Sequence, residues 1–243
     1  NHWESAIILL MTERIGKAVR SPAKDVLLSH AAAAVGRGWG FAVHEAMDQI
    51  GAMTGPLIVM LVLAIRGSYR YAFAVLAIPA LLAITVLLLA RFLYPHTQSF
   101  EEKADHSSKN NGGKLPSMYW LYLVAVCLVA AGYADYPLIA FHIKSHTILQ
   151  DQWIPLLYSG AMGVDALSAL VFGRWYDKKG LLALLVAIAI SSPFAFLAFS
   201  MNAVGIVAGV LLWGIGLGAQ ESIVRSVVAE MVPLHKRGAG FGL

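Results

Sequence analysis

An acidic residue, Asp165, interrupts an apolar stretch of this 243-residue chain, where an ionised carboxylate costs at least ~2.5 kcal/mol. We expect it to face a cavity or a polar partner. Small and polar residues share its helical face, at Tyr158, Ala161, Ser168 and Ala169. This face would suit a water-filled path, and Asp165 would then bind a solute or a proton. The alternative is a buried acid bonded to a neighbouring helix for packing.

A second acid and a histidine, Asp135 and His142, are seven residues apart in another apolar stretch. Two helical turns would place them on one face, with Pro137 breaking the helix between them and Gly132 adding flexibility. The pair could form a proton-accessible acid and base beside a hinge. Alternatively, His142 lies near the outer interface and is simply solvated.

His44 and Asp48 share a helical face with Gly51 and Gly55, at spacings of four, three and four. The His-Asp pair could be a coupling site near the cytoplasmic end or a clamp to the adjoining helix. The glycines, with the following Pro56, predict close helix packing. The sequence HEAMD lacks the second histidine of a zinc protease motif, so we predict no metal site, no cofactor and no catalytic residue.

The elements that carry these residues are membrane-spanning helices. Hydrophobic residues make up 58% of the chain and charged residues 13%, and the mean hydropathy is +0.68. These values exclude a disordered chain, a disulfide scaffold and a basic nucleic-acid module. The single cysteine, Cys127, lies in an apolar run. Because about 20 apolar residues are needed to cross a bilayer, we expect seven spans, at residues 3–20, 41–65, 71–90, 117–141, 153–173, 181–201 and 203–219. The fold class is therefore an all-α polytopic bundle.

Basic residues give an independent test of this span count. Of the 18 Lys and Arg residues, Arg66, Arg70 and Lys144 fall on one side of the membrane, and the remaining fifteen fall on the other. The positive-inside rule makes the richer side cytoplasmic. The first span then runs inward, and with an initial Asn it suggests that the true N-terminus is missing. Residues 94–116 are polar and predict a cytoplasmic linker between helical groups at residues 1–93 and 117–243.

The two ends of the chain repeat a short motif. At an offset of 200 residues, Arg37-Gly38-x-Gly40-Phe41 matches Arg237-Gly238-x-Gly240-Phe241, with six predicted spans between the copies. With a five-residue shift, Arg20-Ser21 matches Arg225-Ser226 and Asp25 matches Glu230. A six-helix unit repeated in parallel is the plan of one large class of transporters.

Charged residues accompany both copies. Glu221 and Arg225 are four apart with the acid first, which favours a helical ion pair. Arg20, Lys24 and Asp25 occupy the matching region of the first copy. We expect these charges to meet at a cytoplasmic seam between the halves, as locks that break when the protein opens. The alternative is a set of surface salt bridges that contribute little.

Several motifs resemble the major facilitator superfamily. The segment GRWYDKKG, Gly173 to Gly180, resembles its cytoplasmic loop signature G-x-x-x-D-[RK]-x-G. Gly51-x-x-x-Gly55-Pro56 resembles the Gly-Pro motif of helix 5, although the trailing glycine pair is absent. Blocks beginning at Glu13, Met162 and Gly218 are similar to a bacterial and archaeal branch. The resemblance implies an incomplete two-bundle fold, in which residues 1–93 are helices 4 to 6 and residues 117–243 are helices 7 to 10.

The resemblance also implies a function. Asp177, with Gly173, Arg174, Lys178 and Gly180, would form a cytoplasmic gate by accepting hydrogen bonds at a helix N-terminus. The alternative is an ordinary loop in which Asp177 only caps a helix. The protein would be a secondary active transporter of a small solute, a symporter or antiporter coupled to protons, and not an enzyme. We expect a monomer in the prokaryotic inner membrane with no nucleic-acid partner. A non-transporting sensor or assembly protein on the same scaffold is the rival hypothesis.

Overall fold

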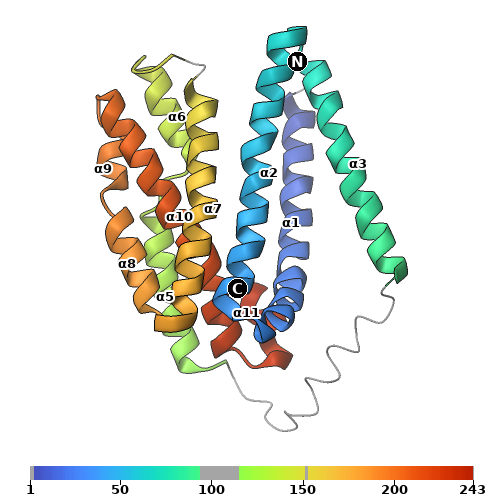
Figure 1. Cartoon of the computed structure of the whole chain (residues 1–243), viewed down its shortest axis with the longest axis vertical. Coiled ribbons are helices and arrows are strands. Elements are labelled where there is room, and N and C mark those ends of the chain that lie inside the picture. The colour runs from blue at the N-terminus through green and yellow to red at the C-terminus, as the bar shows by residue number, and fades with distance from the viewer. Residues whose placement is uncertain (1–2, 94–114, 151–152, 243) are drawn as a thin grey trace.

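The computed structural model describes residues 3–93, 115–150 and 153–242, and helices are the only regular secondary structure in these ranges (Figure 1). The first group comprises α1 (Trp3–Ala31), the 3₁₀ turn η1 (Ala32–Ala34), α2 (Arg37–Arg66) and α3 (Tyr69–Leu93). The second comprises α5 (Ser117–Ala131), α6 (Tyr136–Ser145), α7 (Trp153–Lys179), α8 (Leu182–Ser191), α9 (Phe194–Ala198), α10 (Ala203–Met231), η2 (Leu234–Lys236) and α11 (Arg237–Gly242). The predicted linker lies outside the described residues up to position 114. The division into two bundles stays a prediction.

Five helical segments in the described ranges are long and apolar enough to cross a membrane, at Arg37–Arg66, Arg70–Leu93, Ser117–Ser145, Trp153–Lys179 and Ala203–Met231. They correspond to five of the seven predicted spans. The first predicted span lies in α1, whose Glu13, Arg14 and Lys17 reduce its apolar character. The sixth is divided by Ser192 and Pro193 into α8 and α9. The structure is therefore that of an all-α, multi-pass membrane protein.

The fourth predicted span is broken earlier than expected. α5 ends at Ala131 and α6 begins at Tyr136, so the break precedes Pro137. Pro137 lies in the first turn of α6, where the missing N–H costs no helical hydrogen bond. Asp135 is the exposed residue just before α6. The expectation that Pro137 breaks the helix between Asp135 and His142 is therefore wrong, because the break ends at Asp135 and Pro137 lies inside α6.

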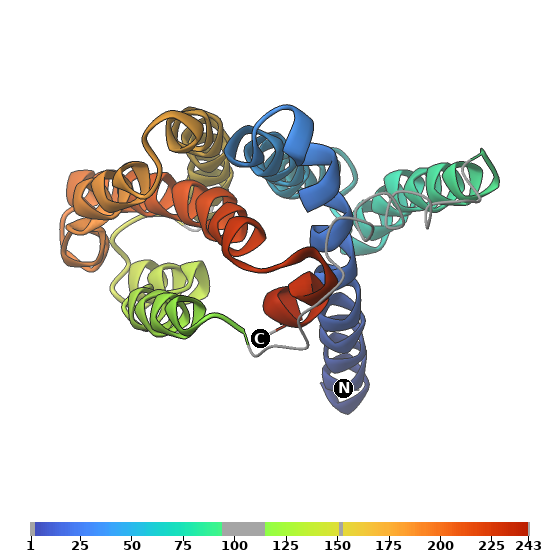
Figure 2. The same ribbon diagram turned by 90° about the horizontal axis from the view of Figure 1, so that it is seen from below.

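The helices α2, α7 and α10 form the centre of the structure. α2 packs along α7, α7 packs along α10, and α10 also contacts α2, α8 and α9. Figure 2, seen from below, shows α3 and the beginning of α1 projecting from this centre. Near its other end α1 contacts α11. Segments close to the two ends of the chain thus lie side by side.

Glycines set the closest helix crossings. A Cβ at Gly38 of α2 would overlap the carbonyl oxygen of Gly173 of α7, and a Cβ at Gly218 of α10 would overlap that of Asp165. By contrast, a Cβ at Gly51 or Gly55 would meet no atom within 4 Å. Close helix packing at Gly51 and Gly55 is therefore absent from the described structure, and Gly38 and Gly173 provide it instead.

Candidate functional site

The carboxylate of Asp177 binds the beginning of α2. Its two oxygens accept hydrogen bonds from the backbone N–H groups of Gly38 and Trp39, each at 2.8 Å. These N–H groups have no partner inside the helix, and the partial positive charge there stabilises an anion. Gly36 precedes the helix with a φ of 102°, and a Cβ at this position would lie 2.5 Å from Oδ2 of Asp177. Asp177 thus caps a helix 138 residues away in the sequence, not one next to it.

The predicted gate loop is mostly helical. Gly173, Arg174, Asp177 and Lys178 lie in the last turns of α7, which extends to Lys179. Only Gly180 lies beyond it, and its φ of 61° ends the helix in the left-handed conformation that glycine tolerates. Placing these residues in a loop was wrong, because no helix breaker precedes Gly180. Their role as a gate stays a prediction.

A second contact joins α2 to α10. Nη1 of Arg225 donates to Oε2 of Glu45 at 2.9 Å, and Nε2 of Gln49 donates to Oε1 of Glu45 at 2.6 Å. Glu45 is 2% exposed, whereas the side chain of Arg225 is 26% exposed. Arg225 was expected to pair with Glu221, but its ion pair is with Glu45, and Glu221 interacts with both. The charged contact therefore connects segments far apart in sequence, not one helix to itself.

Sequence reasoning missed Glu45. It stood beside His44 in a stretch that was interpreted through its histidine and aspartate. The inward face of α2 carries Phe41, Ala42, Glu45, Ala46 and Gln49, all of them buried. An acid at helical spacing with apolar residues was the available signal.

The remaining charges predicted for the seam form a different cluster. Nζ of Lys24 in α1 lies 2.8 Å from Nε2 of His44 and 3.8 Å from Asp48, and His44 lies 3.5 Å from Asp48. Asp25 is buried, 3.9 Å from Lys24. Arg20 is exposed and forms no ion pair with a described residue. The charge of Asp25 also interacts with those of Arg225 and Glu45, so this cluster adjoins the ion pair between α2 and α10, whereas Arg20 stands apart from it. The geometry of His44 and Asp48 favours their alternative interpretation as a clamp between adjoining helices.

Asp165 lies between α7 and α10 and is fully buried. Neither of its carboxylate oxygens has a hydrogen-bond partner among the described residues. Two residues of its face contact α10: Ala161 packs against Gly214, and Oγ of Ser168 donates to the carbonyl of Ile215 at 2.5 Å. Small residues there allow helix contact, and a water-filled path along this face stays a prediction. Asp165 itself remains without a partner.

The predicted acid and base near the outer end have separate surroundings. His142 is half-buried, with Nε2 3.2 Å from the carbonyl oxygen of Ser200 and its ring against Phe199 and His146. Asp135 is exposed and makes no side-chain cap to α6. The structure does not bring these two side chains together. No group of three or more potential metal ligands occurs in the described ranges.

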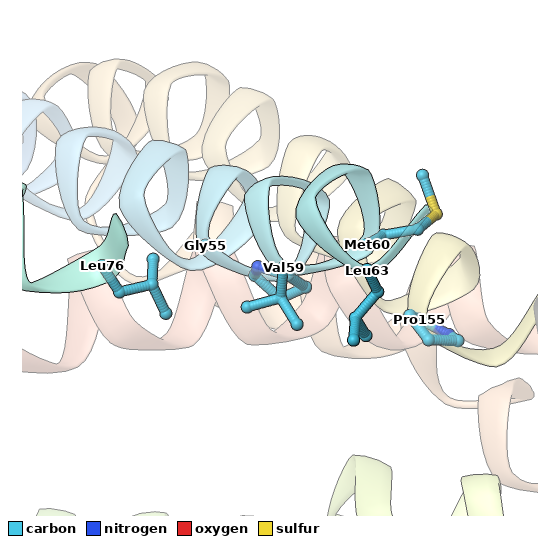
Figure 3. A pocket seen from close by; sticks show the side chains of 7 residues that line it. Gly55, Val59, Met60, Leu63, Leu76 and Pro155 are labelled. Carbon is cyan, nitrogen blue, oxygen red and sulfur yellow. The ribbon is translucent and has the colours of Figure 1, made fainter. Parts of the chain in front are cut away.

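The Gly-Pro motif lines a groove. Gly55 and Pro56 border an apolar groove of about 540 Å³ between α2, α3 and the beginning of α7 (Figure 3). The other lining residues are Val59, Met60, Leu63, Leu76 and Pro155. None carries a charge or a polar side chain, so the groove offers no group that could orient a polar solute.

Comparison with known proteins gives these contacts a context. The model of the Major Facilitator Superfamily matches residues 1–243. The chain belongs to the Major Facilitator Superfamily. The resemblance inferred from the motifs is therefore confirmed. The structure is an incomplete helical bundle of this superfamily.

Similar proteins occur in mycobacteria. The chain is 42% identical over 242 residues to an uncharacterized protein of Mycobacterium tuberculosis and equally to one of Mycobacterium bovis. The alignment covers 98% of this chain, which spans 59% of the length of these curated relatives. No solved structure matches the chain.

Proposed function

We propose that the protein containing this chain is a secondary active transporter that moves a small solute by alternating access and couples this movement to protons. The observation that carries the proposal is the polar seam that joins α2 to α7 and α10. It consists of the cap of α2 by Asp177 and of the ion pair between Glu45 and Arg225. Both contacts lie between segments more than 130 residues apart, and they fasten the cytoplasmic ends of helices that also pack along one another. A rocking movement that opens this end would break them.

The strength of the seam suits a reversible opening. Charge-assisted hydrogen bonds contribute roughly 1.5–3 kcal/mol each, and the charge of Asp177 at a helix end contributes about 0.3–2 kcal/mol. A few kcal/mol hold one state of a two-state protein at well over 90% while leaving the other accessible. Differential binding of a solute or a proton supplies a free energy of this size. The seam therefore serves as a cytoplasmic gate.

Asp165 is the proposed proton-coupling residue. An ionised carboxylate without a partner costs several kcal/mol inside a membrane protein, so a change in its surroundings changes its proton occupancy. It lies in α7, whose end carries Asp177, and it packs directly against α10, which carries Arg225. Movement of α7 against α10 would therefore expose or bury this acid as the seam opens. Exchange with protons in the prokaryotic inner membrane would supply the driving force.

A distance measurement tests the gate and its coupling without knowledge of the solute. The full-length protein, with Cys127→Ser and no other cysteine, carries spin labels at Val35→Cys and Lys179→Cys, on either side of the Asp177 contact. We expect the label distance to lengthen in a pH-dependent fraction of molecules between about pH 5 and pH 8, because burial disfavours the charged form of a carboxylate. Asp165→Asn should remove the pH dependence but keep both distances. A distance that does not respond to pH, or an unchanged response in Asp165→Asn, contradicts coupling through Asp165.

Flux separates a transporter from a sensor. The same protein is reconstituted in vesicles with a pH-sensitive dye inside, and a panel of small cations, anions and amphiphiles is added outside. A transporter should acidify or alkalinise the lumen with at least one solute, and Asp165→Asn should abolish this response. Distances that respond to pH without any solute-driven proton movement favour the rival sensor hypothesis.

A further inference from the structure

The face of α7 beside α2 carries a shallow groove near the cytoplasmic end of the helix. Its volume is about 380 Å³, and its lining residues are Leu170, Val171, Arg174, Trp175 and Lys178. Their spacing places Leu170, Arg174 and Lys178 in one row, with Val171 and Trp175 in the next. Gly173 and Asp165, which contact α2 and α10, lie on other faces of the same helix. The groove is therefore separate from the contacts that form the seam.

The side chains change in character along the groove. Leu170 and Val171 come first, Arg174 and Trp175 follow at nearly one level, and Lys178 stands one turn further toward the end of α7. The distance along the helix axis from Leu170 to Lys178 is roughly 12 Å. This order matches the acyl region, the interface and the phosphate level of one bilayer leaflet, because tryptophan favours the interface and basic residues favour the cytoplasmic surface.

The two basic groups are not neutralised by the protein. Arg174 and Lys178 are both exposed, and neither forms an ion pair with a described residue. The nearest acid in sequence, Asp177, has both oxygens occupied by the N–H groups of α2. Arg174 stacks on the ring of Trp39, 5.2 Å from its centroid, which holds the guanidinium beside the groove while its N–H groups stay available.

We propose that an anionic phospholipid of the cytoplasmic leaflet docks in this groove. Its phosphate lies between Arg174 and Lys178, its glycerol lies beside Trp175, and an acyl chain follows Leu170 and Val171. The two basic side chains pair with the phosphate. The apolar side chains of Leu170 and Val171 give the acyl chain contacts like those it would make with other lipids in the bilayer. A zwitterionic lipid gains less, because its own cation competes with the two basic side chains.

Quenching of Trp175 by brominated lipid tests the proposal. The full-length protein is placed in phosphatidylcholine bilayers that contain increasing fractions of brominated phosphatidylglycerol or brominated phosphatidylcholine. The fluorescence of Trp175 is obtained as the difference between the tryptophan fluorescence of the wild type and that of Trp175→Phe. We expect brominated phosphatidylglycerol to quench Trp175 at a mole fraction at least fivefold lower than brominated phosphatidylcholine does. Each basic residue near the surface contributes about a fivefold preference for the anionic lipid.

Matched substitutions locate the preference. Arg174→Gln with Lys178→Gln should reduce the preference for phosphatidylglycerol by fivefold or more. The control, Arg66→Gln with Arg70→Gln, removes two exposed arginines at the other end of the spans and should retain it. Should the first double variant not fold, Lys178→Gln alone is the substitute, because this exposed lysine makes no hydrogen bond or ion pair with a described residue. Its expected loss is about fivefold.

Two outcomes overturn the proposal. Equal quenching by the two lipids in the wild type, or an unchanged preference in the Arg174 and Lys178 variants, would show only unselective lipid around the helix. Relief of the quenching by inorganic phosphate, beyond that by chloride at equal ionic strength, would assign the groove to a soluble anion. The expected result is that both salts weaken the quenching by phosphatidylglycerol modestly and to the same extent, because both screen the charges equally.

Discussion

The rings of Phe41 in α2 and Phe241 in α11 are in contact, with their centroids 6.2 Å apart. These residues occupy the same position in the two copies of the RGxGF motif, 200 residues apart. Burial and the charge of Arg37 lower the pKa of Arg237, so the arginines of the two copies are also neighbours. Residues at equivalent positions meet only near the axis that relates two repeats. The repeat read from the sequence is thus a contact in the structure.

The aromatic contact should contribute directly to stability. Phe41→Ala should lower the free energy of unfolding by roughly 3–5 kcal/mol, because its ring is fully buried. A double-mutant cycle with Phe241→Ala should give a coupling free energy of about 0.5–1.5 kcal/mol. Denaturant titration in detergent micelles measures both. The same cycle with Phe196, which is 88% exposed, is the control and should give a coupling near zero.

The crossing of α2 and α7 should tolerate no side chain at its glycines. Gly173→Ala places a Cβ against Ala42 and the carbonyl of Gly38, so the helices must separate and the melting temperature should fall. Gly160→Ala in the same helix meets nothing within 4 Å, so it should leave the melting temperature unchanged or raise it. Equal melting temperatures for the two variants would contradict the crossing seen here.

The cap of α2 should control the opening of the seam. Asp177→Asn removes the negative charge at the helix N-terminus, which is worth about 1 kcal/mol, or roughly a fivefold change in population. The longer of the two label distances between positions 35 and 179 should therefore become more populated. Glu13→Gln removes a negative charge at an exposed position away from the cap, so its distance distribution should resemble that of the wild type.

Residue patterns within one helix were sufficient to predict much of this fold. Long apolar runs predicted α2, α3, α7 and α10, and the spacing of glycine and charge identified the motif around Asp177. The partner of Asp177 was not predictable, because the N–H groups of Gly38 and Trp39 belong to a distant segment and leave no mark on local sequence. The pairing of Arg225 has the same explanation. A helical spacing of four suggested Glu221, whereas packing brings Glu45 within 2.9 Å.

Small residues were harder to interpret than charges. The stripe through Ala161 and Ser168 is compatible with a water-filled path and with a close helix crossing, and only the position of α10 decides between them. Gly51 and Gly55 show the reverse case. Their spacing is that of a helix-packing motif, yet no described atom lies within 4 Å of a Cβ at either position. The pattern of small residues on one helix therefore does not determine which other helix packs against them.

The ion pair across the seam should be costly to break on one side only. Glu45→Gln leaves Arg225 without its carboxylate and should destabilise the protein by up to roughly 3–5 kcal/mol, with the partial exposure of Arg225 reducing this value. Adding Arg225→Gln should recover part of the loss, since no unpaired charge remains. Thermal unfolding of the two single variants and the double variant measures the recovery. If the losses simply add, the two side chains do not interact.

Asp165 should show a conflict between stability and function. Its carboxylate is fully buried without a hydrogen-bond partner, so Asp165→Asn, which has nearly the same volume and no charge, removes the cost of an ionised group there. In the unfolded chain this carboxylate is ionised at both pH 5 and pH 8, and the cost of burying it grows as the pH rises. The free energy of unfolding should therefore rise by at least about 1 kcal/mol near pH 8 and by less near pH 5. Glu13→Gln, at an exposed acid, should change it by less than about 0.5 kcal/mol.

The same substitution should abolish the pH response of the label distance while it stabilises the fold. A residue retained only for packing would not behave in this way, because its removal would not increase stability. Destabilisation by Asp165→Asn at both pH values would instead show that the carboxylate has a favourable partner in the intact protein. In that case the proton would have to be carried elsewhere, and Glu221, beside Glu45 and Arg225, is the acid to substitute next.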